Sequence, residues 1–319
     1  MPLTVTYLMH HPQDFIGPNV MNVLVQAVET GIILNQAFTF LSRAERENWV
    51  IRVMALFVTS VAMFQSSLAF YNLWRGHVIH FADWVAATEF IWIDKISPAL
   101  TASMASPVQA FLIYRCWHLT KQSWFTLAPL GAVLITNIVA SIVVTVGTFK
   151  IDFHLLVENI DKIPKIQTDP IFILTLCSSA VLDVAVTSIL LIYLSRARAN
   201  VYSSRFRRVM RKLVALIWEA AVPPCLCAIT VVVTYLTVVN MNYWDLMFQA
   251  ILGKLYVISF FTTVNGRADL VRVAHGTNQN RLTSLAWARS RPVTLTMSVS
   301  ELTIFPSLLT LPKASLALY

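Results

Sequence analysis

Long apolar stretches bounded by charged residues or proline recur seven times along the chain. Each is about 20 residues or longer, which is the length of α-helix that crosses a hydrocarbon core of roughly 30 Å. The pattern therefore predicts an all-α fold, an integral membrane bundle of seven transmembrane helices. The expected spans are residues 20–41, 53–71, 98–117, 124–149, 171–194, 213–239 and 243–264.

The spans divide the chain into three parts. We expect a short extracellular N-terminus over residues 1–19, the seven-helix domain over 20–265 and a mobile cytosolic tail over 266–319. The tail is rich in Ser, Thr and Arg, and Glu301 and Pro306 break its apolar stretch. An eighth membrane-associated element in the tail is the alternative.

Composition supports a membrane-embedded chain. Apolar side chains make up 57% of the 319 residues and charged ones only 13%, and the mean hydropathy is +0.65. Soluble proteins average roughly 45–50% apolar and about 25% charged residues, so this chain has too few polar groups to cover a soluble globule. The same figures exclude a disordered chain and a disulfide-stapled secreted domain. The four cysteines lie in or beside expected spans and are expected to pack as small apolar side chains.

Basic residues are divided unequally between the two sides of the expected bundle. Alternate loops assigned to one side carry 18 of the 24 Lys and Arg residues, whereas the other side carries five. Because cytosolic loops are enriched in Lys and Arg, we expect the N-terminus outside and the C-terminus in the cytosol, in the plasma membrane or an endomembrane. The net charge of +8 follows this distribution and does not indicate nucleic-acid binding. The basic run from Arg196 to Lys212 could contact anionic lipid or a cytosolic partner, although topology alone accounts for it.

Charged residues inside the expected spans are rare. An ionised side chain at mid-membrane costs at least ~2.5–3.5 kcal/mol, so each needs a partner or a function. Asp183 and Lys254 lie near the centres of their spans and are expected to pair in the bundle interior. This pair would either belong to a ligand-binding or proton-handling site or simply fix helix packing. Glu29 either joins the same network or faces the headgroup region.

The last span carries polar residues at spacings of three to four, which places them on one face of a helix. We expect this face to point into the bundle. There it either makes interhelical hydrogen bonds, with Gly253 allowing close approach, or lines a ligand site. The candidate interior binding site consists of Asp183, Lys254, Tyr256 and Ser259.

Arg115 and Glu219 are candidates for a second polar contact at the cytosolic side. They lie near the cytosolic ends of the third and sixth spans, where an ion pair would form a latch of the kind that some seven-helix receptors break on activation. The alternative is that Glu219 neutralises Arg211 or Lys212, which precede it.

No cofactor or metal is expected. A lysine in the seventh helix is where opsins attach retinal, and Phe81-Ala82-Asp83-Trp84 echoes a motif of microbial rhodopsins. That segment falls in an expected extracellular loop and lacks the arginine of the motif, so retinal is not expected. The sequence contains no C-x-x-C, H-E-x-x-H or G-x-S-x-G, and we expect no enzymatic activity.

Three segments resemble one family. Residues 108–120, V-Q-A-F-L-I-Y-R-C-W-H-L-T, are similar to its V-Q-x-F-x-x-x-R-x-W-x-L-[ST] pattern, and Asp183 with the apolar run to Arg196 resembles its D-then-L-x-x-x-R pattern. The last span resembles K-[LVI]-Y-x-N-S-L-L-x-x-L-N-x-R through the K-L-Y of residues 254–256 and the N-G-R of residues 265–267.

This family is a large group of seven-span membrane proteins of mushroom-forming fungi, the basidiomycetes, known as a domain of unknown function. The resemblance covers about residues 15–270. It implies seven spans and a membrane location but no reaction. Two positions depart from the pattern, since Ile258 replaces its Asn and Val264 its Leu.

Two functions remain open from the sequence. The first is a receptor-like or sensory protein, in which an unknown ligand meets the polar interior. The second is a small transporter or channel that uses Asp183, Glu219 and Lys254 along a pathway. An inverted repeat, the usual transporter signature, is not visible. The receptor motifs Asp-Arg-Tyr and Asn-Pro-x-x-Tyr are missing as well.

Overall fold

Helices account for the regular structure of the chain in the computed structural model. It describes residues 13–81, 91–120, 123–150, 170–199, 204–237, 244 and 247–266, and no strand occurs among them. Seven helices are long and apolar enough to cross a membrane. The predicted all-α bundle of seven spans is confirmed, and the chain is an integral membrane protein. Its direction of insertion stays a prediction.

The helices follow the expected order along the chain. The last of the seven, Met247–Gly266, is called the last helix below. A 3-10 turn, η1 (Ala44–Arg46), follows the first helix, and a π-helical segment, η2 (Arg75–Ile79), continues the second. The other six are α2 (Gln13–Leu41), α3 (Trp49–Trp74), α5 (Trp92–Leu119), α6 (Trp124–Phe149), α8 (Pro170–Ala199) and α9 (Ser204–Thr237).

Several helices extend beyond the predicted spans. The first begins at Gln13, so part of the segment assigned to the extracellular N-terminus is helical. An apolar-run criterion misses such turns, because a helix continues into polar sequence wherever its backbone hydrogen bonds can form. The remaining N-terminal residues, 1–12, and the predicted tail from residue 267 lie outside the described residues.

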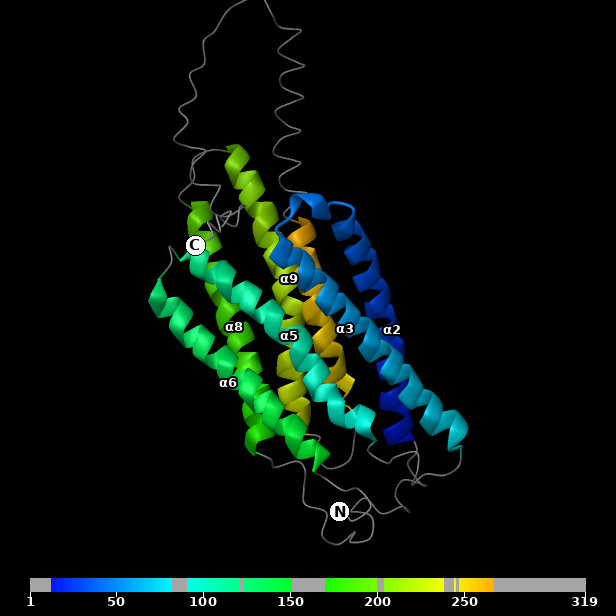
Figure 1. The fold of residues 1–319 in the computed structure, drawn as a ribbon. Coiled ribbons are helices and arrows are strands. Elements are labelled where there is room, and N and C mark those ends of the chain that lie inside the picture. Colours follow the sequence, from blue (N-terminus) through cyan, green and yellow to red (C-terminus); the bar gives the residue numbers. More distant parts are fainter. Residues whose placement is uncertain are drawn as a thin grey trace, which may run out of the picture.

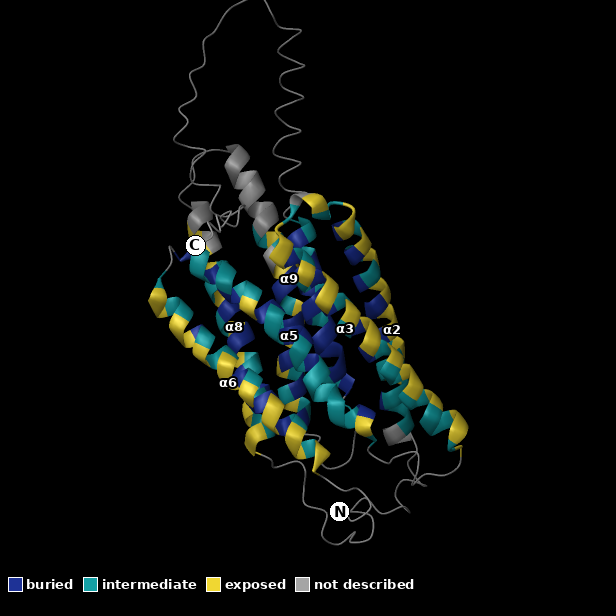
Figure 2. Ribbon diagram, in the orientation of Figure 1, coloured by how far each residue is buried: buried dark blue, intermediate teal, exposed yellow. Residues whose placement is uncertain are grey.

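The last helix is the centre of the bundle. Around it, α2 packs on α3, α3 on α5, α5 on α6 and α8, and α8 on α6 and α9 (Figure 1). Within the spans, 72% of the last helix is buried, against 22–33% for the other six. Buried positions face inward on each helix and exposed apolar ones face outward (Figure 2). This arrangement suits a chain whose outer solvent is hydrocarbon.

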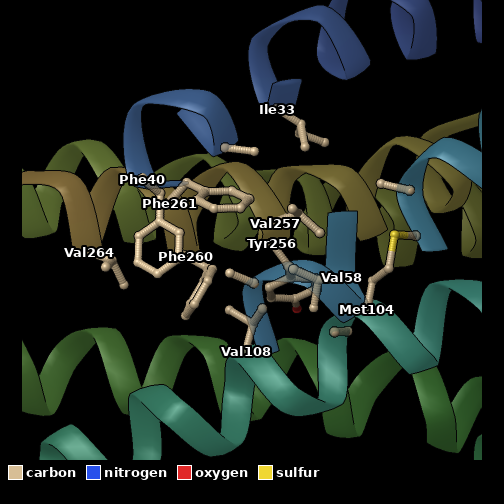
Figure 3. Packing of buried hydrophobic residues seen from close by; sticks show 14 of the residues in the cluster. Ile33, Phe40, Val58, Met104, Val108, Tyr256, Val257, Phe260, Phe261 and Val264 are labelled. Carbon is tan, nitrogen blue, oxygen red and sulfur yellow. The ribbon is translucent and has the colours of Figure 1, made fainter. Parts of the chain in front are cut away.

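Aromatic side chains of the last helix lie in the largest apolar cluster of the described residues, together with side chains of α2, α3 and α5 (Figure 3). Phe261 meets Phe40 of α2 edge to face, with ring centroids 6.1 Å apart, and Phe260 meets Phe111 of α5 at 5.3 Å. Such contacts contribute about 0.5–1.5 kcal/mol beyond the area that they bury. The last helix is therefore anchored on two sides by packing as well as by polar contacts.

Gly253 allows the last helix to approach α5 closely. A Cβ atom at this position would lie 2.7 Å from Cε of Met104 and 3.3 Å from Cγ2 of Thr101. The close approach that the sequence suggested for this glycine is confirmed. All four cysteines are free thiols, as expected for small packing side chains.

Candidate functional site

Buried polar side chains meet the last helix at two places. One group lies where it contacts α5 and α8, and the other where it contacts α2 and α3. We call the first the aspartate cluster, made up of Gln109, Ser179, Asp183 and Tyr256. We call the second the lysine cluster, made up of Gln26, Thr30, Ser66 and Lys254.

Asp183 is the centre of the aspartate cluster and is only 6% exposed. Its Oδ1 accepts a hydrogen bond from Nε2 of Gln109 on α5 at 3.2 Å, and its Oδ2 accepts one from the hydroxyl of Tyr256 on the last helix. Gln109 Nε2 also lies 3.1 Å from the Tyr256 hydroxyl and 3.3 Å from Oγ of Ser179, one turn before Asp183. Three helices are thus joined through one carboxylate, and both of its oxygens accept hydrogen bonds.

Lys254 is the centre of the lysine cluster and is fully buried. Its Nζ donates to Oγ of Ser66 on α3 at 2.6 Å and to Oε1 of Gln26 on α2 at 2.8 Å. Further contacts run to Oγ1 of Thr30 at 3.2 Å and to the carbonyl of Gln26 at 3.3 Å. Neutral oxygens therefore satisfy the three ammonium protons. These hydrogen bonds hold α2 and α3 against the last helix.

Glu29 is the acidic side chain near the lysine cluster. It is 5% exposed and attracts Lys254 electrostatically. No ion pair joins the two within the described part of the chain, and Oε2 of Glu29 has no hydrogen-bond partner there. Glu29 is therefore buried within the bundle beside the lysine cluster, and its depth in the membrane stays a prediction.

A small cavity adjoins the aspartate cluster. Its volume is about 10 Å³, close to the space that one water molecule needs. Two buried oxygens of residues on its wall have no hydrogen-bond partner among the described residues, Oε1 of Gln109 and Oγ of Ser259. The wall consists of Gln109, Leu112, Asp183, Val186, Thr187, Ala221, Pro224, Tyr256 and Ser259.

The expected ion pair between Asp183 and Lys254 does not form. Asp183 is bound by Gln109 and Tyr256, whereas Lys254 turns to α2 and α3. Both residues are buried in the interior, as expected. Asp183 of α8, however, contacts one side of the last helix, whereas the side chain of Lys254 leaves that helix on the other side. Of the candidate binding site, the structure brings together Asp183, Tyr256 and Ser259, and it leaves Lys254 in a separate cluster.

Arg115 and Glu219 are the two residues of the predicted latch. The Arg115 guanidinium lies over the ring of Phe111, 5.3 Å from its centroid, while Glu219 is exposed on α9. The latch between them stays a prediction. The side chains from 197 to 213 lie outside the described residues, and so does the predicted contact of the basic run with lipid or a partner.

Sequence reasoning missed the uncharged members of both clusters as site residues. Apart from the bond between Tyr256 and Asp183, uncharged residues make every hydrogen bond that joins Asp183 or Lys254 to another helix. These residues are Gln109 for Asp183, and Gln26, Thr30 and Ser66 for Lys254. A signal for them exists in the sequence, since amide and hydroxyl side chains within apolar spans are strongly biased toward helix interfaces. Reasoning from charge alone therefore predicted an ion pair between Asp183 and Lys254, which does not form.

This fold and these clusters define a seven-helix integral membrane protein with a polar interior. Residues 179–269 match a family of unknown function (DUF6534), a stretch that runs from the start of the aspartate cluster on α8 through the last helix. No curated protein and no solved structure matches the chain. The similarity agrees with a resemblance to a domain of unknown function and supplies no reaction.

Clusters of His, Cys, Asp and Glu, the usual ligands of transition metals, do not occur in the described part of the chain. No group of three or more His, Cys, Asp or Glu residues there could hold a metal ion. The chemistry available at the aspartate cluster is that of one carboxylate with amide, phenol and alcohol oxygens. Such a set can bind a small polar species or change its hydrogen bonding, and both would move the helices that it joins.

Proposed function

We propose that the protein is a receptor-like membrane sensor whose aspartate cluster is the responsive site. One observation supports this most, the position of the last helix between two buried polar clusters. A rigid helix that is hydrogen-bonded on both sides transmits a displacement on one side to the other. A stimulus that alters the contacts of Asp183 would therefore reach α2 and α3 through Lys254.

The energetic cost of the clusters favours a functional role. Charged side chains are expensive in the bilayer and mark functional sites by default. If these two positions served only to pack the helices, apolar residues could take the place of Asp183 and Lys254. We propose an unknown ligand for the aspartate cluster and a cytosolic partner or anionic lipid at the basic run from Arg196 to Lys212. The proposal includes the plasma membrane or an endomembrane as location, a fungal origin, and no enzymatic reaction.

A transporter or channel is the second candidate. It is favoured by the burial of Glu29, Asp183 and Lys254 at interhelical contacts, since chains of ionisable groups form proton relays in pumps and transporters. The exposure of Glu219 weakens the pathway that the sequence suggested, because this residue does not join the other charges. The two candidates differ in whether protons or ions cross the membrane.

Hydrogen exchange measures the coupling that the sensor proposal needs. We compare wild type with Asp183→Asn, in which the side chain keeps its size but loses its charge. Exchange should change in α2 around Gln26 and Thr30, although these residues contact Lys254 and not Asp183. Asp94→Asn, at the start of α5 and bound to Asn72, is the matched control and should leave α2 unchanged. Changes confined to α5 and α8 would contradict the proposal.

A liposome assay separates the second candidate. The full chain is reconstituted with a pH-sensitive dye inside the vesicles. A sensor gives no flux above empty vesicles, whereas a transporter gives a proton or ion flux that Asp183→Asn abolishes. Such a flux would replace the sensor proposal with the transporter.

A further inference from the structure

Both oxygens of the Asp183 carboxylate accept hydrogen bonds from neutral donors, Gln109 and Tyr256. With Gln109 and Tyr256 assigned as donors the carboxylate is ionised, whereas a protonated acid would itself donate to the Tyr256 hydroxyl. No cation contacts Asp183 within the described residues, since Lys254 is bound on the other side of the last helix. A buried negative charge at this depth needs a positive counter-charge.

Two further oxygens of the cavity wall lack partners. Oε1 of Gln109 and Oγ of Ser259 are buried and make no hydrogen bond in the described part of the chain, and both residues are 2% exposed. Buried polar atoms are normally satisfied, and each exception calls for an explanation. A proton on Asp183 removes the charge and a water molecule pairs the two oxygens, whereas one bound cation does both at once. The salt dependence of stability described below separates these two arrangements.

The geometry points to a binding site for a single small monovalent cation, of the size of sodium, between Asp183, Gln109 and Ser259. One carboxylate balances one positive charge, and the oxygens are hard ligands that suit such an ion. The cavity of about 10 Å³ has room for one particle of water size. Thr187, one turn after Asp183 on the same wall, offers a further hydroxyl.

Divalent cations fit these residues less well. Calcium takes six to eight oxygen ligands, often several carboxylates, and magnesium usually keeps several of its waters. A cavity of about 10 Å³ with one carboxylate meets neither demand. Potassium carries the same charge as sodium but is larger, so it should bind more weakly in a site of this size.

Pro224 adds a local reason for a cation at this wall. It lines the cavity within α9, and proline has no N–H to donate to the carbonyl four residues before it. The carbonyl of Ala220, which precedes the wall residue Ala221, therefore loses its regular helical donor. We include this oxygen in the proposal as a further source of negative potential near the site.

The inference deepens the proposed function, because it names a ligand class for the aspartate cluster and rests on that cluster being the responsive site. Bound cation would strengthen the contact between α5, α8 and the last helix. Loss of the cation would leave an uncompensated carboxylate and loosen the same contact. Sodium would thus regulate the state of the sensor.

Thermal unfolding of the full chain in detergent tests this inference. The Tm is measured against increasing NaCl, KCl or choline chloride at constant ionic strength. A ligand that binds only the folded state stabilises it by mass action, so NaCl should raise the Tm by a few degrees and saturate. KCl should act more weakly. Identical curves in NaCl and choline chloride would overturn the inference.

Variants locate the site. Asp183→Asn should abolish the sodium response, and Ser259→Ala should raise the NaCl concentration for half of the effect several-fold. Ser178→Ala is the matched control, because its hydroxyl is buried on α8 but bonded to Asn137, away from the cavity. It should keep the wild-type response. A sodium response that survives unchanged in Ser259→Ala and Asp183→Asn would contradict the assignment.

Two measures keep the result clear. If Asp183→Asn does not fold, sodium binding is measured directly by the broadening of the sodium NMR line. Wild type should broaden this line more than Ser259→Ala does, and equal broadening would contradict the assigned site. The readout is equilibrium stability and needs no signalling. Failure of the sodium test therefore leaves the hydrogen-exchange test of the sensor proposal intact, and the reverse also holds.

Discussion

Lys254 and Tyr256 stand two residues apart on the last helix, yet their polar atoms enter different helix interfaces. The lysine Nζ lies 2.6 Å from Oγ of Ser66 on α3, whereas the tyrosine hydroxyl lies 3.1 Å from Nε2 of Gln109 on α5. An α-helix has 3.6 residues per turn, so two positions differ by roughly 200° around its axis. The two residues thus hold the last helix from opposite sides.

This relationship predicts which residue pairs are energetically coupled. Residues in one hydrogen-bond network show coupling energies of about 0.5–3 kcal/mol in double-mutant cycles, whereas independent sites add within about 0.5 kcal/mol. Asp183→Asn combined with Tyr256→Phe should therefore be non-additive. Asp183→Asn combined with Lys254→Met should show a smaller coupling, because it is carried only through the last helix and not by a shared hydrogen bond. The free energy of unfolding in mixed detergent micelles measures both cycles, and a coupling of Asp183 with Lys254 as strong as that with Tyr256 would contradict two separate clusters.

Removal of the buried lysine charge should destabilise the protein through Glu29. Lys254→Met leaves the oxygens of Gln26 and Ser66 without their donor and the glutamate without its attracting charge. Leaving a buried acceptor without its donor typically costs about 1–3 kcal/mol for each group, and we expect a loss of about 3 kcal/mol. Adding Glu29→Gln should restore part of it. A double variant that is less stable than Lys254→Met would show that Glu29 does not depend on the lysine.

Gly253→Ala should weaken the contact between the last helix and α5. The added Cβ would meet Met104, which is fully buried, and the side chain of Thr101. Overpacking of this kind costs typically 1–3 kcal/mol. The matched control is Gly131→Ala on α6, where a Cβ would meet nothing within 4 Å. The control should not lower the unfolding free energy, since alanine favours helix more than glycine; equal losses in the two variants would contradict the packing argument.

The direction of insertion can be measured with single cysteines at two exposed positions. Phe81→Cys lies beyond η2, on the side predicted to be extracellular, and Glu45→Cys lies in η1, on the side predicted to be cytosolic. A membrane-impermeant maleimide applied to intact cells should label only Phe81→Cys. Glu45→Cys should react after permeabilisation. The parent chain is the control, because none of its four cysteines is exposed. The reverse labelling would place the N-terminus in the cytosol.

The sequence predicts the elements of this fold well. Seven apolar runs become seven helices, because backbone hydrogen bonds must be satisfied within each segment that crosses hydrocarbon. Low charge content also makes Asp183 and Lys254 easy to find, and both are buried. The depth of these residues along their helices follows from their positions in the runs. The direction in which each side chain points does not.

Only the tertiary structure decided how each helix is rotated about its own axis. Periodicity shows that Lys254 and Tyr256 belong to an interior helix but cannot say which neighbours surround it. The last helix is buried on all sides, so a polar residue at any angle can find a partner. For this reason the sequence determined seven membrane helices and the identity of the buried charges, whereas the packing of α2, α3, α5 and α8 around the last helix determined that those charges lie apart.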